Sequence, residues 1–231
     1  MPHIKNRLVS KTILAPVKTV AMLLFLACAT APVEQTSPVV YDGNYPRSIL
    51  VMPPVNLSPD VKAPLTFLAT SMFPLAESGY YVIPVALSDE TFKQNGVTVA
   101  EEANTITHNR LREIFGADAA LYITVTGFGV RYNLINSIVE ARASARLVDL
   151  RNGRELWSGQ ASSVSGEADA FSHGFEGIVV SLLSAAVNQV VNTLADTSFT
   201  VGAQANRQLL SAGQKNGIPY GPRHPRFVGT N

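Results

Sequence analysis

Side chains that could perform catalysis are few in this sequence, and they are scattered. No segment shows a GxSxG nucleophile elbow, an HExxH zinc helix, a Walker A phosphate loop or a CxxC pair. His108, His173 and His224 fall in separate segments, and only His173 has carboxylates close by, at Asp169 and Glu176. A solvated loop explains that cluster more simply than a metal site, which needs several ligands to converge. The sequence therefore predicts a protein that is not an enzyme and holds no metal or cofactor.

The single cysteine, Cys28, is the one residue whose surroundings indicate a specific chemistry. Four cations and no carboxylate precede it, and an apolar run from Thr19 to Ala27 leads into it. This run is far shorter than the ~20 residues of a spanning helix, so it is typical of a cleavable secretory signal. The ending Phe25-Leu-Ala-Cys28 resembles the lipobox of bacterial lipoproteins, whose cysteine is acylated and becomes the mature N-terminus. An ordinary signal peptide, or a short anchor with an incidental cysteine, is the alternative.

Acylation at Cys28 would hold the mature chain on a membrane. Three palmitate-like chains, at ~0.8 kcal/mol per buried methylene, exceed what stable anchoring needs. Ala29 rather than Asp follows the cysteine, which by resemblance to Gram-negative lipoproteins favours the outer membrane. Cleavage removes 27 of 231 residues and four of 18 cations, leaving 14 cations against 17 carboxylates, a formal charge of −3. We therefore expect no binding to nucleic acid, and attachment through the lipid alone.

The composition divides the chain into four parts. A lipoprotein signal peptide spans 1–27, and a tether rich in Ala, Pro, Val and Thr spans 28–46. Residues 47–213 are expected to form a single α/β domain, because 46% of the residues are hydrophobic and a chain of this size can bury a core. Residues 214–231 carry several glycines and prolines and should form an irregular tail.

The first half of the domain has the pattern of a βαβ unit. A strand at 48–52, a helix at 61–75 and a strand at 80–83 have the spacing of a parallel crossover. Ser88 is positioned to cap a short helix that ends near Gln94. A longer helix is expected over 99–115, with Gly116 terminating it.

Two alternating segments then predict an antiparallel hairpin. A three-residue loop of Arg151, Asn152 and Gly153 would pair Leu147 with Trp157, whereas a two-residue loop would leave Trp157 on the charged face. The three-residue loop is preferred, and Trp157 is interpreted as a core residue. Gly127-Phe-Gly129 lacks the third glycine of a dinucleotide motif and is interpreted as a bulge.

A helix over 178–194 and a last helix near 200–211 complete the expected elements. Most of the first helix is apolar around the narrow polar stripe of Ser181, Ser184, Asn188 and Asn192, so it should pack across the sheet, although a homodimer interface is also open. The fold class is therefore α/β, a three-layer-like sandwich of a mixed sheet with a βαβ start, an antiparallel hairpin and packed helices. Near the C-terminus, Tyr220, Arg223, Arg226 and Phe227 could contact a partner, or could belong to a frayed end.

Four segments together resemble a known family. They are Ser48-Ile-Leu-Val-Met-Pro-Pro-Val-Asn56, Gly79-Tyr-Tyr-Val-Ile-Pro84, Gly116-Ala-Asp118 and Asn216-Gly-Ile-Pro-Tyr-Gly-Pro-Arg223. They resemble Gram-negative outer-membrane lipoproteins of unknown function, known from a meningococcal surface-antigen candidate. The resemblance implies an α/β sandwich similar to the amino-terminal domain of TolB and to the curli-secretion lipoprotein. It also implies a role in envelope transport or secretion, and it assigns no catalytic residues.

The leading hypothesis is a lipid-anchored periplasmic module that binds proteins within an envelope transport assembly. Its partners would be other envelope lipoproteins or transporter components, with a homodimer as one form. The alternative is a periplasmic small-molecule-binding protein or hydrolase with a pocket at the carboxyl edge of the sheet, near Pro53 and Pro54. A filled, apolar strand end there would favour the module.

Overall fold

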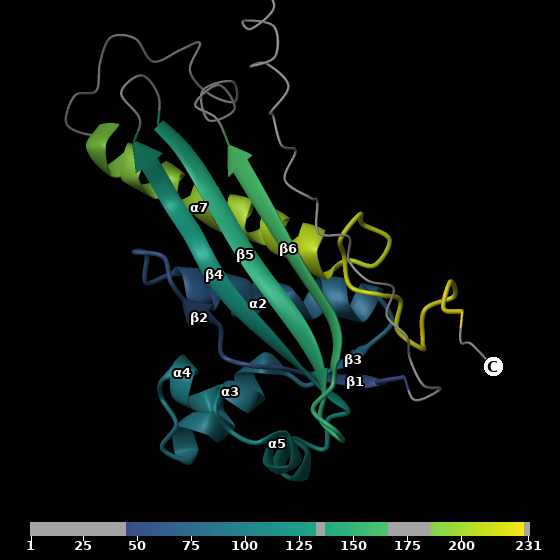
Figure 1. Ribbon diagram of the computed structural model, residues 1–231. Coiled ribbons are helices and arrows are strands. Elements are labelled where there is room, and N and C mark those ends of the chain that lie inside the picture. Colours follow the sequence, from purple (N-terminus) through teal and green to yellow (C-terminus); the bar gives the residue numbers. More distant parts are fainter. Residues whose placement is uncertain (1–44, 133–136, 166–185, 229–231) are drawn as a thin grey trace, which may run out of the picture. The chain divides into compact units, whose positions relative to one another are not determined.

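The structure is a computed structural model that describes residues 45–132, 137–165 and 186–228. These residues form a six-stranded mixed sheet with the order β3-β1-β4-β5-β6, in which β2 also pairs with β4 (Figure 1). The strands are β1 (Ser48–Val51), β2 (Val55–Asn56), β3 (Tyr81–Val82), β4 (Ala119–Tyr132), β5 (Ser137–Asp149) and β6 (Glu155–Ser165). The helices are α2 (Ala63–Glu77), α3 (Val85–Gln94), α4 (Ala100–Ala103), α5 (His108–Phe115) and α7 (Ala186–Leu210).

The domain begins with the expected βαβ unit. β1 pairs in parallel with β3, with Ser48 opposite Tyr81, and in parallel with β4 on its other side. Ile49, Leu50 and Val51 are all buried because helices cover both faces of β1. A continuous apolar run is what such a doubly covered strand requires.

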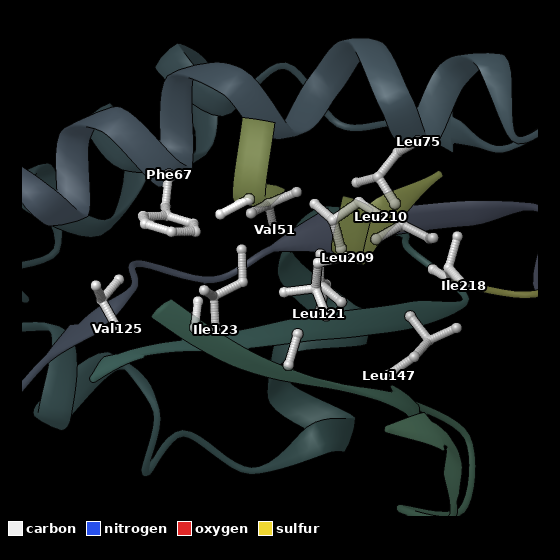
Figure 2. Packing of buried hydrophobic residues seen from close by; sticks show 14 of the residues in the cluster. Val51, Phe67, Leu75, Leu121, Ile123, Val125, Leu147, Leu209, Leu210 and Ile218 are labelled. Atoms are coloured by element: carbon white, nitrogen blue, oxygen red, sulfur yellow. The ribbon is translucent and has the colours of Figure 1, made fainter. Parts of the chain in front are cut away.

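Helices cover the two faces of the sheet unequally (Figure 1). α2 and α7 pack on one face and enclose the main core, part of which is shown in Figure 2. The short helices α3, α4 and α5 cover the other face around Leu50, Met52 and Leu111. Farther along that face, Ser144, Arg146, Ser158, Gln160 and Ser162 of the long hairpin are exposed. The α/β fold with a mixed sheet, a βαβ start and an antiparallel hairpin is confirmed.

The hairpin register is confirmed, whereas the loop length is not. Leu147 pairs with Trp157, and Ala143 pairs with Ala161. The backbone N–H of Asp149 donates to the carbonyl of Arg154 at 2.9 Å, so four residues rather than three form the loop. Val148 then pairs with Glu155 and Leu147 with Trp157, so Leu156 is an additional residue in β6 and the predicted register holds from Leu147 onward. The extra loop residue is Leu150, whose side chain is buried in the smaller core and whose backbone N–H donates to the carbonyl of Asp118 at 2.9 Å instead of pairing across the hairpin.

β4 contains the predicted bulge. The register with β5 shifts between Val125 and Gly127, so Thr126 is the additional residue. A Cβ atom on Gly127 would lie 3.0 Å from Nε of Arg142, so glycine makes room for that side chain. Beyond the bulge, Phe128 turns inward and its ring meets that of Phe67.

Three helix predictions need correction. The helix near Ser88 begins at Val85 after Pro84, and Ser88 lies buried inside it with its hydroxyl donating to the carbonyl of Val85. The helix expected over 99–115 is two helices, α4 and α5. Residues 104–107 are Asn, Thr, Ile and Thr, all weaker helix formers, and Thr105 Oγ1 donates to the carbonyl of Glu102 at 2.8 Å.

The third correction concerns the C-terminal helices. Residues 200–210 are not a separate helix but the last part of α7, which runs unbroken from Ala186. Residues 178–185 of the other expected helix lie outside the described residues, and so do the side chains of its polar stripe. Gly116 does end α5 as predicted, with a left-handed φ of 65°.

Candidate interaction surfaces

The C-terminal tail packs onto the turn between α2 and β3. Ile218 is buried in the main core, and the Tyr80 hydroxyl donates to the carbonyl of Pro219 at 2.8 Å. The backbone N–H of Gly221 donates to the carbonyl of Ser78 at 2.7 Å. Gly79 has a φ of 94°, and a Cβ atom there would lie 2.5 Å from the backbone nitrogen of His224. This close approach requires glycine and keeps the tail against the domain.

All four tail residues predicted to contact a partner lie together, within what we call the basic–aromatic surface. It consists of Tyr45, Tyr81, Tyr220, Arg223, His224, Arg226 and Phe227. The Arg223 guanidinium lies 5.6 Å from the centroid of the Tyr81 ring. Tyr220 stacks on His224 at 4.2 Å, and Arg226 Nη1 donates to the Tyr220 hydroxyl at 3.4 Å.

Two aromatic residues of this surface come from the other end of the domain. The ring of Tyr45 meets the ring of Phe227 edge-on at 4.7 Å, and Tyr81 is supplied by β3. Sequence analysis missed both, because only the pairing of β3 with β1 and the docking of the tail bring distant segments together. Their aromatic character was a signal, but nothing local connected it to the tail.

The outward side of α2 is a second unusual surface. Val61, Leu65 and Phe73 are 84%, 68% and 61% exposed, and Leu57 in the preceding segment is also exposed. We call these four residues the outer α2 face. No charged residue occurs between Lys62 and Glu77. This missing charge was the available sequence signal, because an ordinary surface helix carries charged residues on its solvent side.

The inward side of α2 is, by contrast, partly polar where it meets α7. Asn206 of α7 is fully buried, and its Nδ2 donates to the carbonyl of Phe67 at 2.8 Å and to Thr70 Oγ1 at 2.8 Å. Ser71 Oγ lies 3.2 Å from the same nitrogen. Gly202 lets the helices approach, since a Cβ atom there would lie 2.8 Å from the Thr66 methyl group. These contacts form the α2–α7 seam.

Buried side chains fill the carboxyl end of β1. Val51, Met52 and Pro54 are buried there, and the Met52 N–H donates to the carbonyl of Leu121 at 2.9 Å. The strand end is therefore filled and apolar. A hollow of about 650 Å³ lies instead along β6, bordered by Arg142, Gln160, Ser162, Gln208, Gln214 and Lys215 among others. Its described lining offers amides, hydroxyls and two cations, and no carboxylate or histidine.

Among the described carboxylates, Asp149 has a shifted pKa, and its role is structural. Asp149 is almost fully buried, and this burial would by itself raise its pKa. Hydrogen bonds from the side chain and backbone of Arg151 outweigh the burial and hold the pKa of Asp149 below its ordinary value. In the part of the chain that the structure describes, no three His, Cys, Asp or Glu residues gather as a metal site would require.

Some predicted residues cannot be placed. Cys28, and the cluster of His173 with Asp169 and Glu176, lie outside the described residues. Within the described ranges, none of the helices combines the length and apolarity needed to cross a bilayer.

The fold and the sequence together define a lipoprotein-family α/β domain. The family described as "Putative lipoprotein GNA1162-like" matches residues 39–223, and the chain belongs to this family. The "Putative lipoprotein NMB1124/NMB1162" of Neisseria meningitidis serogroup B is 44% identical over 203 residues, which cover 88% of this chain and 93% of that protein. The resemblance stated from the sequence is therefore confirmed.

A solved structure of the same family is also similar to this chain. The crystal structure of lipoprotein GNA1162 from Neisseria meningitidis is 49% identical, with a TM-score of 0.51, and the match covers 64% of this chain and 99% of that one. A PelC dodecamer from Paraburkholderia phytofirmans is 12% identical with a TM-score of 0.43, over 72% of this chain and 89% of that one.

Proposed function

We propose that this protein is a non-enzymatic, lipid-anchored module that binds a partner protein in an envelope transport or secretion assembly. Acyl chains on Cys28 would hold it to the outer membrane, with its domain in the periplasm. The outer α2 face is the observation that carries the proposal. It is the surface on which a partner protein would be seated.

The energetics of the outer α2 face support a protein partner. Full burial of a Leu or Phe side chain contributes about 1.5–3 kcal/mol, so Leu65 and Phe73 together could supply several kcal/mol of binding free energy. Contiguous exposed apolar side chains on a soluble domain are typical of interaction sites. Lys62 and Glu77 carry opposite charges at the two ends of α2 and could set the direction in which a partner helix docks.

The filled carboxyl end of β1 supports the module over the small-molecule or hydrolase alternative. Such a ligand would need space beside Pro53 and Pro54, where Met52 and Pro54 are packed. The hollow along β6 has no paired acid and base among its described lining residues. The proposal therefore assigns no catalytic residue and no cofactor.

Site-specific photocrosslinking in native membranes tests the proposal. A photoreactive amino acid at Phe73 is expected to give a discrete adduct with an envelope protein, whereas the same group at the exposed Lys93 of α3 is the matched control. Leu65→Lys in the Phe73-labelled protein should abolish the adduct. Equal adducts at both positions, or an adduct that persists with Leu65→Lys, would contradict binding through the outer α2 face. Cys28→Ala should release the protein from membranes.

A further inference from the structure

The basic–aromatic surface carries a local positive charge that the whole-chain balance conceals. Arg223 and Arg226 are exposed, and so is Arg47 just before β1, which adjoins this surface because its backbone carbonyl accepts from the Tyr81 N–H at 2.9 Å. Among the described residues, none of the three is in an ion pair with a carboxylate. The carboxylate of Asp118 accepts hydrogen bonds from the Arg47 backbone N–H and from Ser48, not from the Arg47 guanidinium. The guanidinium groups are thus available to an anionic surface.

Aromatic and apolar side chains accompany these cations. Tyr81 is 47% exposed beneath Arg223, and Val228 at the end of the described tail is 84% exposed. Tyr220 and Phe227 are half-buried beside them. Arginines mixed with tyrosines and a few apolar side chains match a membrane–water interface, where amphipathic rings lie at the level of the headgroups.

The position of this surface relative to the anchor favours a membrane over an acidic protein. Tyr45, whose ring contacts Phe227, is the residue at which the segment from Cys28 reaches the domain. Cys28 precedes Tyr45 by 17 residues, so the surface lies within ~60 Å of chain length from the acylation site. A tether of this length gives the nearby surface a high effective concentration at the bilayer, where weak contacts suffice.

We infer that the basic–aromatic surface docks onto anionic lipid headgroups and so orients the domain on its membrane. This inference rests on the lipid anchoring in the proposed function, and it replaces the expectation that attachment depends on the lipid alone. Arg47, Arg223 and Arg226 supply the charge, and Tyr81 and Val228 enter the interfacial layer. Each exposed cation contributes roughly a fivefold increase in headgroup affinity at low ionic strength.

A spin label on the tail of the mature lipoprotein tests the docking. Because Cys28 is acylated, Val228→Cys provides a unique thiol, and Ser158→Cys on β6 provides the control position. The protein is reconstituted into vesicles of phosphatidylcholine alone or with 30% phosphatidylglycerol. Power saturation is then measured with a water-soluble nickel chelate. We expect the label at position 228 to be shielded at least threefold in anionic vesicles only, and 0.5 M salt to remove the shielding. Equal accessibility in both vesicles would overturn the inference.

Matched charge variants separate local docking from net charge. Arg223→Gln with Arg226→Gln should abolish the shielding, whereas Arg110→Gln with Arg112→Gln on α5 removes two other exposed cations, of which Arg110 is paired with Glu113, and should not. If both pairs act equally, or if shielding appears in native envelope membranes but not in anionic vesicles, the inference is wrong. Unchanged thermal midpoints verify folding. Protein that remains in the vesicle fraction with an unshielded label refutes the docking alone, whereas protein lost from that fraction refutes the anchoring in the proposed function.

Discussion

The side of α2 that packs in the core combines Phe67 and Leu75 with a polar strip facing α7, whereas its outward side exposes apolar residues and carries no charge before Glu77. Its inward side buries Thr66 and Ser71 against Asn206 of α7, whereas its outward side exposes Leu65 and Phe73. The hydroxyls of Thr66 and Ser71 and the Nδ2 group of Asn206 are tolerated because they are hydrogen-bonded, whereas Asn206 Oδ1 is buried with no partner among the described residues. The outward apolar groups have no such compensation in the described domain. Burial in this helix therefore follows the pairing of helices, and its outer side remains apolar and exposed in the described domain.

The largest expected effect tests the polar side of α2. Asn206→Asp replaces a buried donor with a carboxylate that faces the Phe67 carbonyl, Thr70 Oγ1 and Ser71 Oγ. We expect a loss of about 3 kcal/mol or more in the free energy of unfolding at pH 7. Burial would raise the pKa of the introduced carboxyl, so part of the loss should be recovered as the pH falls towards 5. Urea unfolding at both pH values measures this, and a loss below about 1 kcal/mol would contradict a structural role for the seam.

A second, smaller effect tests how closely the helices must approach. In Gly202→Ala the new Cβ atom would lie 2.7 Å from a ring carbon of Phe128 and 2.8 Å from the Thr66 methyl group. Overpacking should cost about 1–3 kcal/mol, even though alanine favours helix by about 1 kcal/mol. Thr66→Ser removes the methyl group and should restore part of the stability in the double variant. If the free-energy changes of the two single variants simply add in the double variant, the contact between positions 202 and 66 does not limit how closely α2 and α7 approach.

The Asp149–Arg151 ion pair lies outside the α2–α7 seam, and it tests a charged interaction against the uncharged contacts of that seam. Because the folded pKa of Asp149 lies below its unfolded value, its stabilisation is present above about pH 4 and is lost as the pH falls towards the folded pKa. Asp149→Asn should therefore cost about 1–2 kcal/mol at pH 7, and the difference from the native chain should shrink below pH 4. Chemical unfolding across pH 3–7 measures it. If the difference in free energy of unfolding between the two proteins does not change with pH, the ion pair of Asp149 with Arg151 does not stabilise the fold.

The smallest expected effect on stability tests the apolar side. Leu65→Ser with Phe73→Ser should change the free energy of unfolding by less than about 0.5 kcal/mol each, because both side chains are exposed in the described domain. In the protein that carries the photoreactive group at position 73, Leu65→Ser alone should weaken the crosslink from the outer α2 face. Comparison with Phe67→Ser, in the core beside them, provides the control. A large loss of stability from the outer pair would show that a part of the same chain already covers them.

Local patterns predicted those elements whose cause is local. The β1 run, the left-handed Gly116 and the bulge near Gly127 each depend on a few consecutive residues, and the structure has all three. The register of Leu147 with Trp157 followed from side-chain parity alone, because a slip of one residue would have turned Trp157 to the charged face. Boundaries were less predictable. The division of α4 from α5 depends on weak propensities, and the loop at Leu150 depends on a core that no local pattern reveals.

The sequence by itself determined that this chain has one thiol, at Cys28, directly after a basic and apolar N-terminal run, an α/β order of elements and a basic, aromatic ending. Only the tertiary structure decided which faces those elements would present. Docking of the tail on Gly79 gathers Tyr45, Tyr81 and Arg223 on one surface, and pairing with α7 leaves Leu65 outside while Asn206 goes inside. The physical reason is that burial and charge clustering are properties of contacts between distant segments, whereas periodicity and composition report only on neighbours along the chain.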